Sequence, residues 1–324
     1  MRIGITMGDS SGVGPELIIR AFQQGQIQGD AVVIGDYDIL EKCAELLDIS
    51  APLRKIKNWT EREIRAGFIN VYDLGIIKKE ALTIGKISKI SGYAAAQYVE
   101  RATGLALNKQ IAAIVTLPMN KEATRLSMPD FTGHTELIAK ICKQSHYTMM
   151  LASDKLIVTH VNTHVSMADA IHNTTQDRVY EVIQLTQDTL KHFIDRPRIA
   201  VAGLNCHAGE NGSFGREDIE RIRPAVLQAR GEGIDAEGPL PPDTVFLKAY
   251  QKKYDAVVCM YHDQGHIPMK LLDFEGGVNV TLGLDVIRTS VDHGTAFDIA
   301  YQGKASISSF VKAFEFAKKM IDFH

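Results

Sequence analysis

The sequence predicts an α/β fold made of two α/β/α domains. The chain has 324 residues, and single hydrophobic cores stop growing near about 250–300 residues, so a chain of this length divides into roughly two domains. Short apolar runs alternate with helix-like segments over the whole length, which indicates parallel sheets covered by helices. Several of these runs are almost continuous in aliphatic residues, as in strands that are buried on both faces.

The expected strands are short apolar runs, most of which end next to a polar loop. They lie at 3–7, 31–35, 111–117, 149–153, 156–160, 198–203, 256–261 and 278–282. Helices are expected at 178–193 and 307–323, where apolar side chains recur with a helical period. Because ligands bind at the carboxyl ends of strands in open α/β sheets, we expect the functional residues in the loops that follow these strands.

Composition excludes several classes of protein. The net charge is −3, with 45% hydrophobic and 23% charged residues, which argues against a general nucleic-acid-binding surface. No apolar run approaches the roughly 18 residues needed to cross a bilayer, and the N-terminus lacks the pattern of a signal peptide. The cysteines are scattered and form no CxxC pair, as in a cytosolic protein with reduced thiols. We therefore expect a cytoplasmic protein without nucleic-acid or membrane partners.

A glycine-rich loop follows the first expected strand. Gly8, Gly12 and Gly14 form a GxxxGxG spacing, which is neither the dinucleotide fingerprint GxGxxG nor the Walker motif. Pro15 suits the first turn of a helix, and Glu16 complements the helix dipole there. The pattern predicts a tight turn from strand to helix, and it leaves open whether the helix N-terminus binds an anion.

Three histidines follow three expected strands: His164, His207 and His262. Imidazoles from three strand ends can bind one divalent cation and leave positions open for water or substrate. Such nitrogen ligands suit zinc, cobalt, nickel or manganese better than calcium. Asp263 is placed to orient a metal-bound His262. The alternative is that each histidine is a hydrogen-bonded structural residue or an acid–base group. His160 lies inside an expected strand and is expected in the core.

Hydroxyl, amide and cationic side chains also follow the expected strands. His134 and Thr135 stand at the start of an expected helix, and Arg288 is expected after a strand. Lys270 and Asn279 lie in later segments of the chain. These donors suit a small substrate that carries phosphate or carboxylate. The alternative is that they are ordinary solvated loop residues.

Several long motifs, in one order along the chain, resemble those of the 4-hydroxythreonine-4-phosphate dehydrogenase family. They are "MGDSSGVGPEL", "TLPMNKEA", "FTGHTE", "GLNCHAGENGSFG", "GPLPPDT", "YDAVVCMYHDQGHIPMK" and "VNVTLGLDVIRTSVDHGTAFDIA". The resemblance covers the chain from end to end. Two departures stand out: Ser10 and Ser11 replace a Pro-Ala pair that is common in the family, and Cys206 replaces a proline.

The resemblance implies an NAD-dependent enzyme that also needs one divalent metal ion (zinc, cobalt, nickel, manganese or magnesium). Such enzymes oxidise the C3 hydroxyl of a four-carbon phosphorylated acid, and the resulting β-keto acid loses carbon dioxide. The implied metal ligands are His164, His207 and His262. The implied substrate-binding residues are His134, Thr135, Lys270, Asn279 and Arg288. The resemblance also implies a homodimer whose site forms at the subunit interface, with the third histidine coming from the other subunit.

The wording of several motifs is similar to a sister branch of the family. "GENGSFG", "PPDTVFLKAY" and "DQGHIPMKLL" resemble enzymes that convert 4-phospho-D-threonate or 4-phospho-D-erythronate to dihydroxyacetone phosphate. The first alternative is 4-hydroxy-L-threonine 4-phosphate, the substrate in pyridoxal phosphate (vitamin B6) biosynthesis, which carries an amino group at C2. The more distant alternatives are a metal-dependent hydrolase and a sugar-phosphate-binding protein without catalysis.

The segment "DHGTAFDIA" resembles the NAD loop of isocitrate and isopropylmalate dehydrogenases. The resemblance implies their fold, which is not Rossmann, with an interdomain cleft of which the opening loop forms one wall. The implied cofactor-binding residues are His293, Gly294, Thr295, Ala296 and Asp298. A carboxylate at Asp298 favours NAD over NADP, whose 2′-phosphate it would repel.

One residue is expected to serve as the general base. The candidates are Lys270, Asp243 and Asp263. The predicted domains are 1–125 together with 300–324, and 126–299. The second domain is expected to carry most of the metal, substrate and NAD residues.

Overall fold

A computed structural model describes residues 2–27, 31–59, 64–274 and 276–322 of the chain. These form two compact units, 1–145 with 284–322 and 146–283. The units differ in bounds from the predicted domains. Helix α5 (His134–Cys142) packs against α3 (Lys89–Leu107), and strand β12 (Ile287–Ser290) pairs with β5 (Ala113–Thr116). Both contacts place these segments in the first unit.

The first unit contains a parallel sheet, with the described strands in the order β3-β4-β2-β1-β5-β12. The remaining strands of this sheet are β1 (Ile3–Thr6), β2 (Ala31–Gly35), β3 (Leu53–Ile56) and β4 (Ile69–Asp73). Every residue of β1, β2 and β5 is buried, so both faces of the central strands are covered. This is the arrangement that continuous aliphatic runs predict.

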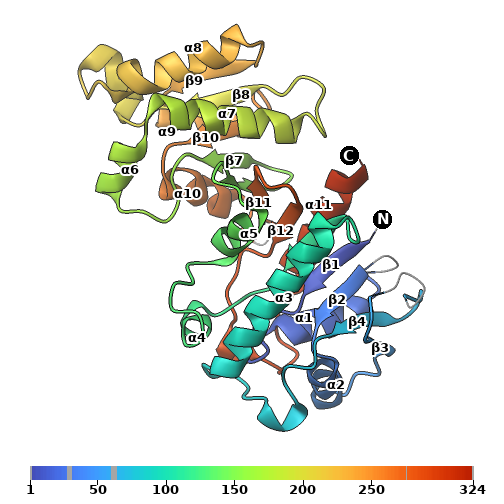
Figure 1. Cartoon of the computed structure of the whole chain (residues 1–324). Coiled ribbons are helices and arrows are strands. Elements are labelled where there is room, and N and C mark those ends of the chain that lie inside the picture. The colour runs from blue at the N-terminus through green and yellow to red at the C-terminus, as the bar shows by residue number, and fades with distance from the viewer. Residues whose placement is uncertain (1, 28–30, 60–63, 275, 323–324) are drawn as a thin grey trace. The chain divides into compact units, whose positions relative to one another are not determined.

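Helices flank the strands of the first unit (Figure 1). Besides α3 and α5 they are α1 (Gly14–Gln23), α2 (Tyr37–Leu46), α4 (Lys121–Arg125) and α11 (Ser308–Asp322). Both α3 and α11 pack on β1 and β5. Ser88 caps α3, because its side chain accepts a hydrogen bond from the Ser91 amide.

The second unit contains a mixed sheet, with the described strands in the order β11-β6-β7-β10-β8-β9. They are β6 (Thr148–Ala152), β7 (Ile157–His160), β8 (Ile199–Ala202), β9 (Ala236–Leu240), β10 (Ala256–Cys259) and β11 (Val278–Leu282). Strand β6 runs antiparallel to both β7 and β11. The prediction of parallel strands throughout is therefore wrong here. A tight turn, closed by the Ser153 amide and the Leu156 carbonyl at 3.0 Å, joins β6 to β7 as a hairpin.

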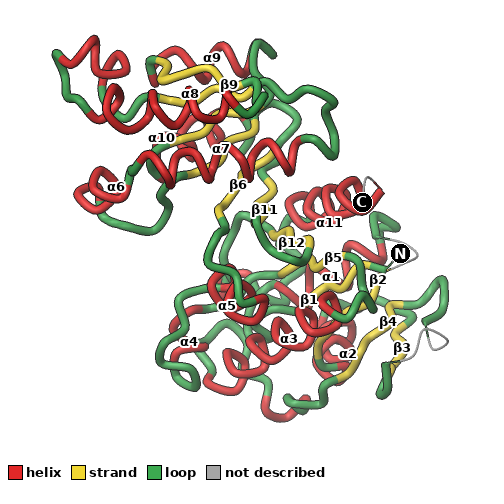
Figure 2. The backbone as a smooth tube through the Cα atoms, turned by 45° about the horizontal axis from the view of Figure 1, so that its top comes forward, coloured by secondary structure: helices red, strands yellow, loops and turns green. Residues whose placement is uncertain are grey.

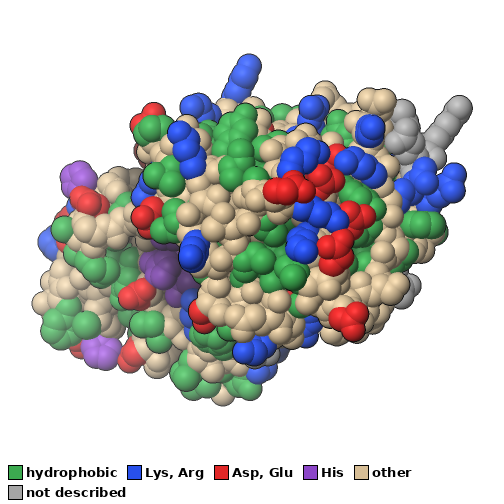
Figure 3. Space-filling model, turned by 90° about the horizontal axis from the view of Figure 1, so that it is seen from below, with side chains coloured by type: hydrophobic (Ala, Val, Ile, Leu, Met, Phe, Trp, Pro, Cys, Tyr) green, Lys and Arg blue, Asp and Glu red, His purple; other side chains and the backbone are tan. Residues whose placement is uncertain are grey.

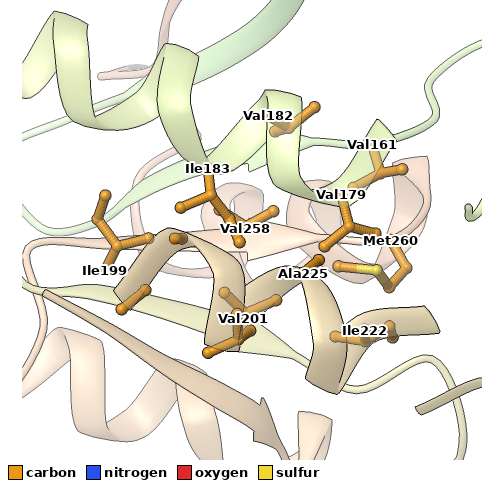
Figure 4. Close-up of a cluster of buried hydrophobic side chains, with 13 residues drawn as sticks. Val161, Val179, Val182, Ile183, Ile199, Val201, Ile222, Ala225, Val258 and Met260 are labelled. Atoms are coloured by element: carbon orange, nitrogen blue, oxygen red, sulfur yellow. The ribbon is translucent and has the colours of Figure 1, made fainter. Parts of the chain in front are cut away.

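Helices cover both faces of this sheet, as the separate colours for helix and strand show in Figure 2. They are α6 (Met167–Asn173), α7 (Gln176–Leu190), α8 (Arg223–Gly231), α9 (Pro242–Tyr250) and α10 (His262–Leu272). Alternate residues of β8 face opposite ways. Ile199 and Val201 pack in one cluster with side chains of α7 and α8 (Figure 4), and Ala200 and Ala202 pack in another with side chains of α9 and α10. The unit is thus a three-layer α/β/α sandwich.

Each strand that we expected from the sequence is present, and so are both helices. The sequence missed β3, β4, β9 and β12. Strand β9 contains Gly238 and Pro239, which are rare inside strands. Strand β12 contains Arg288, which lies within the strand and is 3% exposed. Our placement of Arg288 after a strand is therefore wrong, because a charged residue hid the strand pattern.

The surface of the described chain mixes both signs of charge. Figure 3 shows basic and acidic side chains next to each other on the face that it presents. No helix among the described residues is both long and apolar enough to span a membrane.

Candidate functional site

The glycine-rich opening loop lies against the segment that we predicted to bind NAD. The Val13 amide donates to the Thr295 carbonyl at 3.0 Å, and the Tyr301 hydroxyl donates to the Ser10 carbonyl at 2.6 Å. A Cβ atom on Gly12 would lie 2.6 Å from the Thr295 carbonyl oxygen. Glycine is therefore required at position 12 because two backbones meet there.

Other parts of the chain also contact the first turn of α1. A Cβ atom on Gly14 would lie 2.2 Å from the Met7 carbonyl oxygen. The buried Glu16 carboxylate accepts hydrogen bonds from the Ala305 amide at 3.0 Å and from Arg20 at 3.3 Å. The loop thus joins β1 to the chain that precedes α11. This arrangement favours the interpretation as a tight turn over that as a phosphate site.

Asp9 is a buried carboxyl in this loop. Its Oδ1 accepts a hydrogen bond from the Ser11 amide at 2.9 Å, and its Oδ2 has no partner among the described residues. Burial raises the pKa of Asp9 to about 6. The loop therefore carries a carboxyl that titrates close to neutral pH.

The predicted NAD residues lie in the first unit, not mainly in the second as we expected. His293, Gly294 and Asp298 are exposed, whereas Thr295 is 9% exposed and is held by the opening loop. Ala296 has a left-handed backbone, with φ of 43°. No heavy atom of the described chain lies within 4 Å of a Cβ built on Gly294. This short loop is thus anchored at Thr295 and open to solvent on either side.

Arg288 is a buried cation in the first unit. Its Nε and Nη2 donate to the Thr116 hydroxyl at 3.1 and 2.7 Å, and its Nη1 donates to the Thr135 hydroxyl at 3.4 Å. Burial lowers the pKa of Arg288 to about 10, so the guanidinium keeps its charge at pH 7. The charge of Glu136 acts on this pKa in the opposite direction, as a smaller cause. A guanidinium grouped with hydroxyl donors suits the binding of a carboxylate or phosphate group.

His134 stands beside this cation at the first residue of α5. Burial, with the charge of Arg288 as a smaller cause, lowers the pKa of His134 to about 3. Its imidazole is therefore neutral at pH 7, and its Nε2 is buried without a partner among the described residues. The first turn of α5 has no side-chain cap from Gly133. His134, Thr135 and Arg288 thus lie together, and their role in binding an anion stays a prediction.

His262 is the first residue of α10, directly after β10. Its Nδ1 lies 2.7 Å from the Asp263 carboxylate. Since a carboxylate only accepts, the imidazole donates from Nδ1 and keeps the lone pair of Nε2 for another partner. The ring of His164 lies 5.8 Å from the ring of His262, between their centroids. These are two of the three predicted metal ligands.

His207 begins an unusual stretch of backbone. Residues 207–211 have φ between 39° and 76°, and four of these five are not glycine. Each non-glycine residue in this left-handed region costs about 1–2 kcal/mol. The fully buried Asp218 carboxylate holds the entry to the turn, because it accepts hydrogen bonds from the Leu204 amide at 2.8 Å and the Asn205 amide at 3.1 Å. The turn presents His207 to solvent, with its Nδ1 4.0 Å from Asp243.

One buried amide joins the strand ends that carry these histidines. The Gln264 side chain accepts a hydrogen bond from the Met260 amide at 2.7 Å and donates to the Gly203 carbonyl at 2.8 Å. Met260 follows β10 and Gly203 follows β8. The loops that contain His262 and His207 are thus braced against each other at their origins.

The imidazole donors suit a divalent transition metal. His164 and His262 lie near each other, and His207 instead contacts Asp243 and Phe214. Among the described residues no group of three His, Cys, Asp or Glu side chains is arranged to hold a metal ion. The ligand chemistry of the three histidines therefore fits, and the structure brings two of the three near each other.

The remaining predicted residues lie in the second unit. Lys270 is on the exposed side of α10, with its ammonium 5.9 Å from the Phe274 ring centroid. Asn279 lies in β11 and donates to the Met149 sulfur at 2.9 Å. Asp263 and Asp243 each lie beside a histidine, as described above.

Sequence reasoning missed four residues of these sites: Thr116, Asp218, Gln264 and His266. His266 follows His262 by one helical turn of α10, and that spacing would have been a usable signal if a helix had been expected there. Its ring stacks on that of His262, with 3.6 Å between centroids. Burial lowers the pKa of His266 to about 4 and that of His160 to about 3. His160 is fully buried, as expected.

The chain is similar to known proteins over almost its whole length. The sequence pattern of the family described as "pyridoxal phosphate biosynthetic protein PdxA" matches residues 28–317. The D-threonate 4-phosphate dehydrogenase of Salmonella typhimurium is 46% identical over 98% of each chain. The 4-hydroxythreonine-4-phosphate dehydrogenase of Desulforapulum autotrophicum is 42% identical over 97% of this chain and 94% of the relative.

The chain belongs to the PdxA family. A crystal structure of a 4-hydroxythreonine-4-phosphate dehydrogenase from Klebsiella pneumoniae has a TM-score of 0.90 and 43% identity, with 99% of each chain covered. The apo β-decarboxylating dehydrogenase of Thermococcus kodakarensis shares the fold alone, at a TM-score of 0.52 and 13% identity over 98% of this chain and 83% of that one. These likenesses confirm the predicted isocitrate-dehydrogenase-like fold. The protein is a dehydrogenase that acts on CH–OH, which sets aside the hydrolase and the non-catalytic binding protein.

Ala208→Gly should stabilise this PdxA-family chain. Ala208 has φ of 53°, which glycine adopts without a steric cost. After subtraction of the larger entropy of an unfolded glycine, we expect a gain of up to about 1 kcal/mol in the free energy of unfolding. Urea denaturation measures it. Ala168→Gly on the exposed side of α6 is the matched control, and it should destabilise the protein. A loss of stability in Ala208→Gly would contradict the left-handed turn.

The stability of the protein should fall as the pH falls from 7 to 5, in part through His134. Because its pKa lies near 3 in the folded chain and 6.5 otherwise, the unfolded chain binds the extra proton in this window. One such histidine contributes about 2 kcal/mol to the change between pH 7 and 5. Asp9 contributes in the opposite direction, since its pKa is raised. His134→Asn should therefore show a shallower pH dependence of unfolding in urea, and equal slopes would contradict a buried neutral imidazole.

Proposed function

We propose that this protein oxidises the C3 hydroxyl of 4-phospho-D-threonate or 4-phospho-D-erythronate with NAD and a divalent metal ion. Decarboxylation of the keto acid then yields dihydroxyacetone phosphate. The observation that carries an anionic substrate is the buried Arg288 guanidinium, which lies together with the hydroxyl groups of Thr116 and Thr135. The choice of C2 hydroxyl over C2 amino group rests on the wording of the motifs "GENGSFG" and "DQGHIPMKLL".

The substrate-binding roles follow the chemistry of each side chain. In the first unit, the Arg288 guanidinium and the Thr135 hydroxyl bind an anionic group, with the neutral His134 beside them. In the second unit, we assign Lys270 and Asn279 to the substrate because they match the family motifs. The alternative substrate, 4-hydroxy-L-threonine 4-phosphate, carries the same phosphate and needs the same cations.

We assign His164, His207 and His262 to one divalent metal ion. When bound, such an ion supplies Lewis-acid polarisation of a hydroxyl oxygen. The protein's own contribution is orientation, because Asp263 holds the Nδ1 proton of His262 and leaves Nε2 available. Zinc, cobalt, nickel, manganese and magnesium are the candidate ions.

For the general base we favour Lys270. Asp263 is engaged with His262, and Asp243 lies beside His207, so both carboxylates are committed to histidines. The remaining candidate is Lys270 on α10, whose Nζ accepts a proton from the substrate hydroxyl only as an uncharged amine.

NAD binding is assigned to residues 293–298. The space above Gly294 allows a ligand to approach the backbone closely, and the exposed Asp298 carboxylate suits ribose hydroxyls. When bound, NAD supplies the hydride acceptor of the oxidation. The protein's own part is to hold this loop in place through Thr295 and the opening loop.

We further propose that the working form is a homodimer with shared sites. The dimer is what the resemblance to the family implies, and a donor from a second copy would complete the metal site, since the described residues of one chain bring only two of the three histidines near each other. Helix α10 and the residues after it carry an exposed apolar stripe, with Ile267, Leu271 and Phe274 being 64%, 83% and 74% exposed. Such a stripe is typical of a surface that another chain covers. It lies on the helix that begins with His262.

The substrate class is tested by reduction of NAD at 340 nm with a divalent metal present. We expect kcat/KM to be highest for 4-phospho-D-threonate or 4-phospho-D-erythronate and lower for 4-hydroxy-L-threonine 4-phosphate. Arg288→Lys keeps the charge and loses the fork of donors, so it should raise KM by about tenfold or more. Dominance of the amino acid substrate would overturn our choice of branch.

Shared sites are tested by mixing inactive variants. His164→Ala, His207→Ala and His262→Ala should each abolish turnover and weaken metal binding. When two such variants are unfolded, mixed and refolded, heterodimers restore one intact site if the two histidines come from different subunits. Activity should then return to about a quarter of the wild-type value. If no pair of variants regains activity, the shared site is wrong.

A further inference from the structure

Three imidazole rings lie close together in the second unit, and only that of His262 is assigned a role above. The ring of His266 lies parallel to that of His262, with 3.6 Å between centroids and 11° between planes. The ring of His160 lies 4.8 Å from that of His266, with 44° between planes, and 6.4 Å from that of His262. His160 therefore lies beside the stacked pair of His262 and His266.

Each of the three rings is held by a hydrogen bond from its Nδ1 atom. His266 donates to the His262 carbonyl at 3.0 Å, and His160 donates to the Met149 carbonyl at 3.4 Å. Carbonyl oxygens only accept, so the proton of each neutral ring resides on Nδ1. His262 donates in the same way to Asp263. These hydrogen bonds fix the tautomer of each of the three rings.

Burial restricts the rings of His160 and His266. His160 is fully buried and His266 is 6% exposed. The backbone at Gly265 lies against His160, since a Cβ there would lie 2.5 Å from Nε2 of His160. Any larger residue at 265 would push His160 out of its place. The backbone of α10 therefore approaches His160 as closely as it can.

We propose that His266 is a positioning residue for His262. Asp263 sets which nitrogen of His262 is free, but one hydrogen bond at the ring edge does not stop the ring from tilting. A parallel ring at van der Waals distance does stop it, because rotation about the Cβ–Cγ bond of His262 would drive its atoms into His266. His266 in turn is restrained because it is 6% exposed and its Nδ1 donates to the His262 carbonyl at 3.0 Å. Steric contact with the flat face of His266, and not a hydrogen bond to one of its nitrogens, restricts rotation of the His262 ring.

The inference deepens the proposed metal-binding function and rests on it. A ligand that is held in one orientation binds a metal more tightly than one that must be ordered on binding. Loss of such support lowers metal affinity by about 10- to 100-fold. His266→Ala should therefore weaken binding, whereas His266→Phe keeps a flat ring and should change it by less than about threefold. His172→Ala, on the exposed end of α6, is the control.

The test uses the full-length protein and Co²⁺ alone, titrated by calorimetry, with circular dichroism to check folding. We expect about tenfold weaker binding for His266→Ala, near wild-type binding for His266→Phe, and wild-type binding for His172→Ala. Wild-type affinity in folded His266→Ala would overturn the proposal. So would an equal loss in the Phe and Ala variants, because the nitrogens of His266 would then matter and its flat face would not.

A second measurement needs no metal. In long-range ¹⁵N–¹H spectra of the metal-free protein, His262 should show one sharp tautomer in the wild type and in His266→Phe. In His266→Ala its signals should average. A sharp single tautomer in His266→Ala would overturn the positioning role. If the wild type does not bind Co²⁺, the proposed metal function fails by itself, and these spectra still decide whether His266 orders His262.

Discussion

A single buried side-chain amide, that of Gln264, connects two strand ends of the second unit. Gln264 joins the chain after β10 to the chain after β8, through hydrogen bonds of 2.7 and 2.8 Å. The two loops that leave these strands carry His262 and His207. Strand ends in a parallel pair would otherwise diverge into independent loops. Because Gln264 is 7% exposed, its bonds face little competition from water, and both loops start from one defined point.

The same unit tolerates local backbone strain because its surroundings over-determine it. The left-handed turn at 207–211 would be unfavourable in isolation. It persists because the Asp218 carboxylate binds the two amides before it, and because Gly203 lets Ala208 pack closely. A carboxylate that accepts backbone hydrogen bonds is among the stronger anchors available to a loop. The result is a histidine that projects from a rigid turn.

The first unit uses backbone contact for a similar purpose. Gly12 and Gly14 allow the opening loop to touch the Thr295 and Met7 carbonyl groups, which side chains would prevent. The loop therefore serves as a support for the predicted NAD segment. Its glycines look like those of a nucleotide-binding loop because both need close backbone approach. The difference lies in what approaches, which is the protein's own chain.

Local patterns allowed most of the fold and much of the site to be predicted. The eight expected strands were recognisable because buried strands are continuous aliphatic runs. Strand β12 was missed because Arg288 interrupts such a run, and β9 was missed because of Gly238 and Pro239. The three histidines that we propose as metal ligands were singled out because each follows a strand. Asp218 and Gln264 were missed because polar side chains that brace a loop have no periodicity of their own.

The sequence by itself determined the α/β class, the order of the elements, the family and the residue types of the site. Only the tertiary structure decided that Arg288 is a buried cation, that His266 stacks on His262, and that the opening loop rests on Thr295. The physical reason is distance along the chain. Period and composition report on neighbours within a few residues, whereas burial and stacking depend on segments that meet only after the sheets have formed.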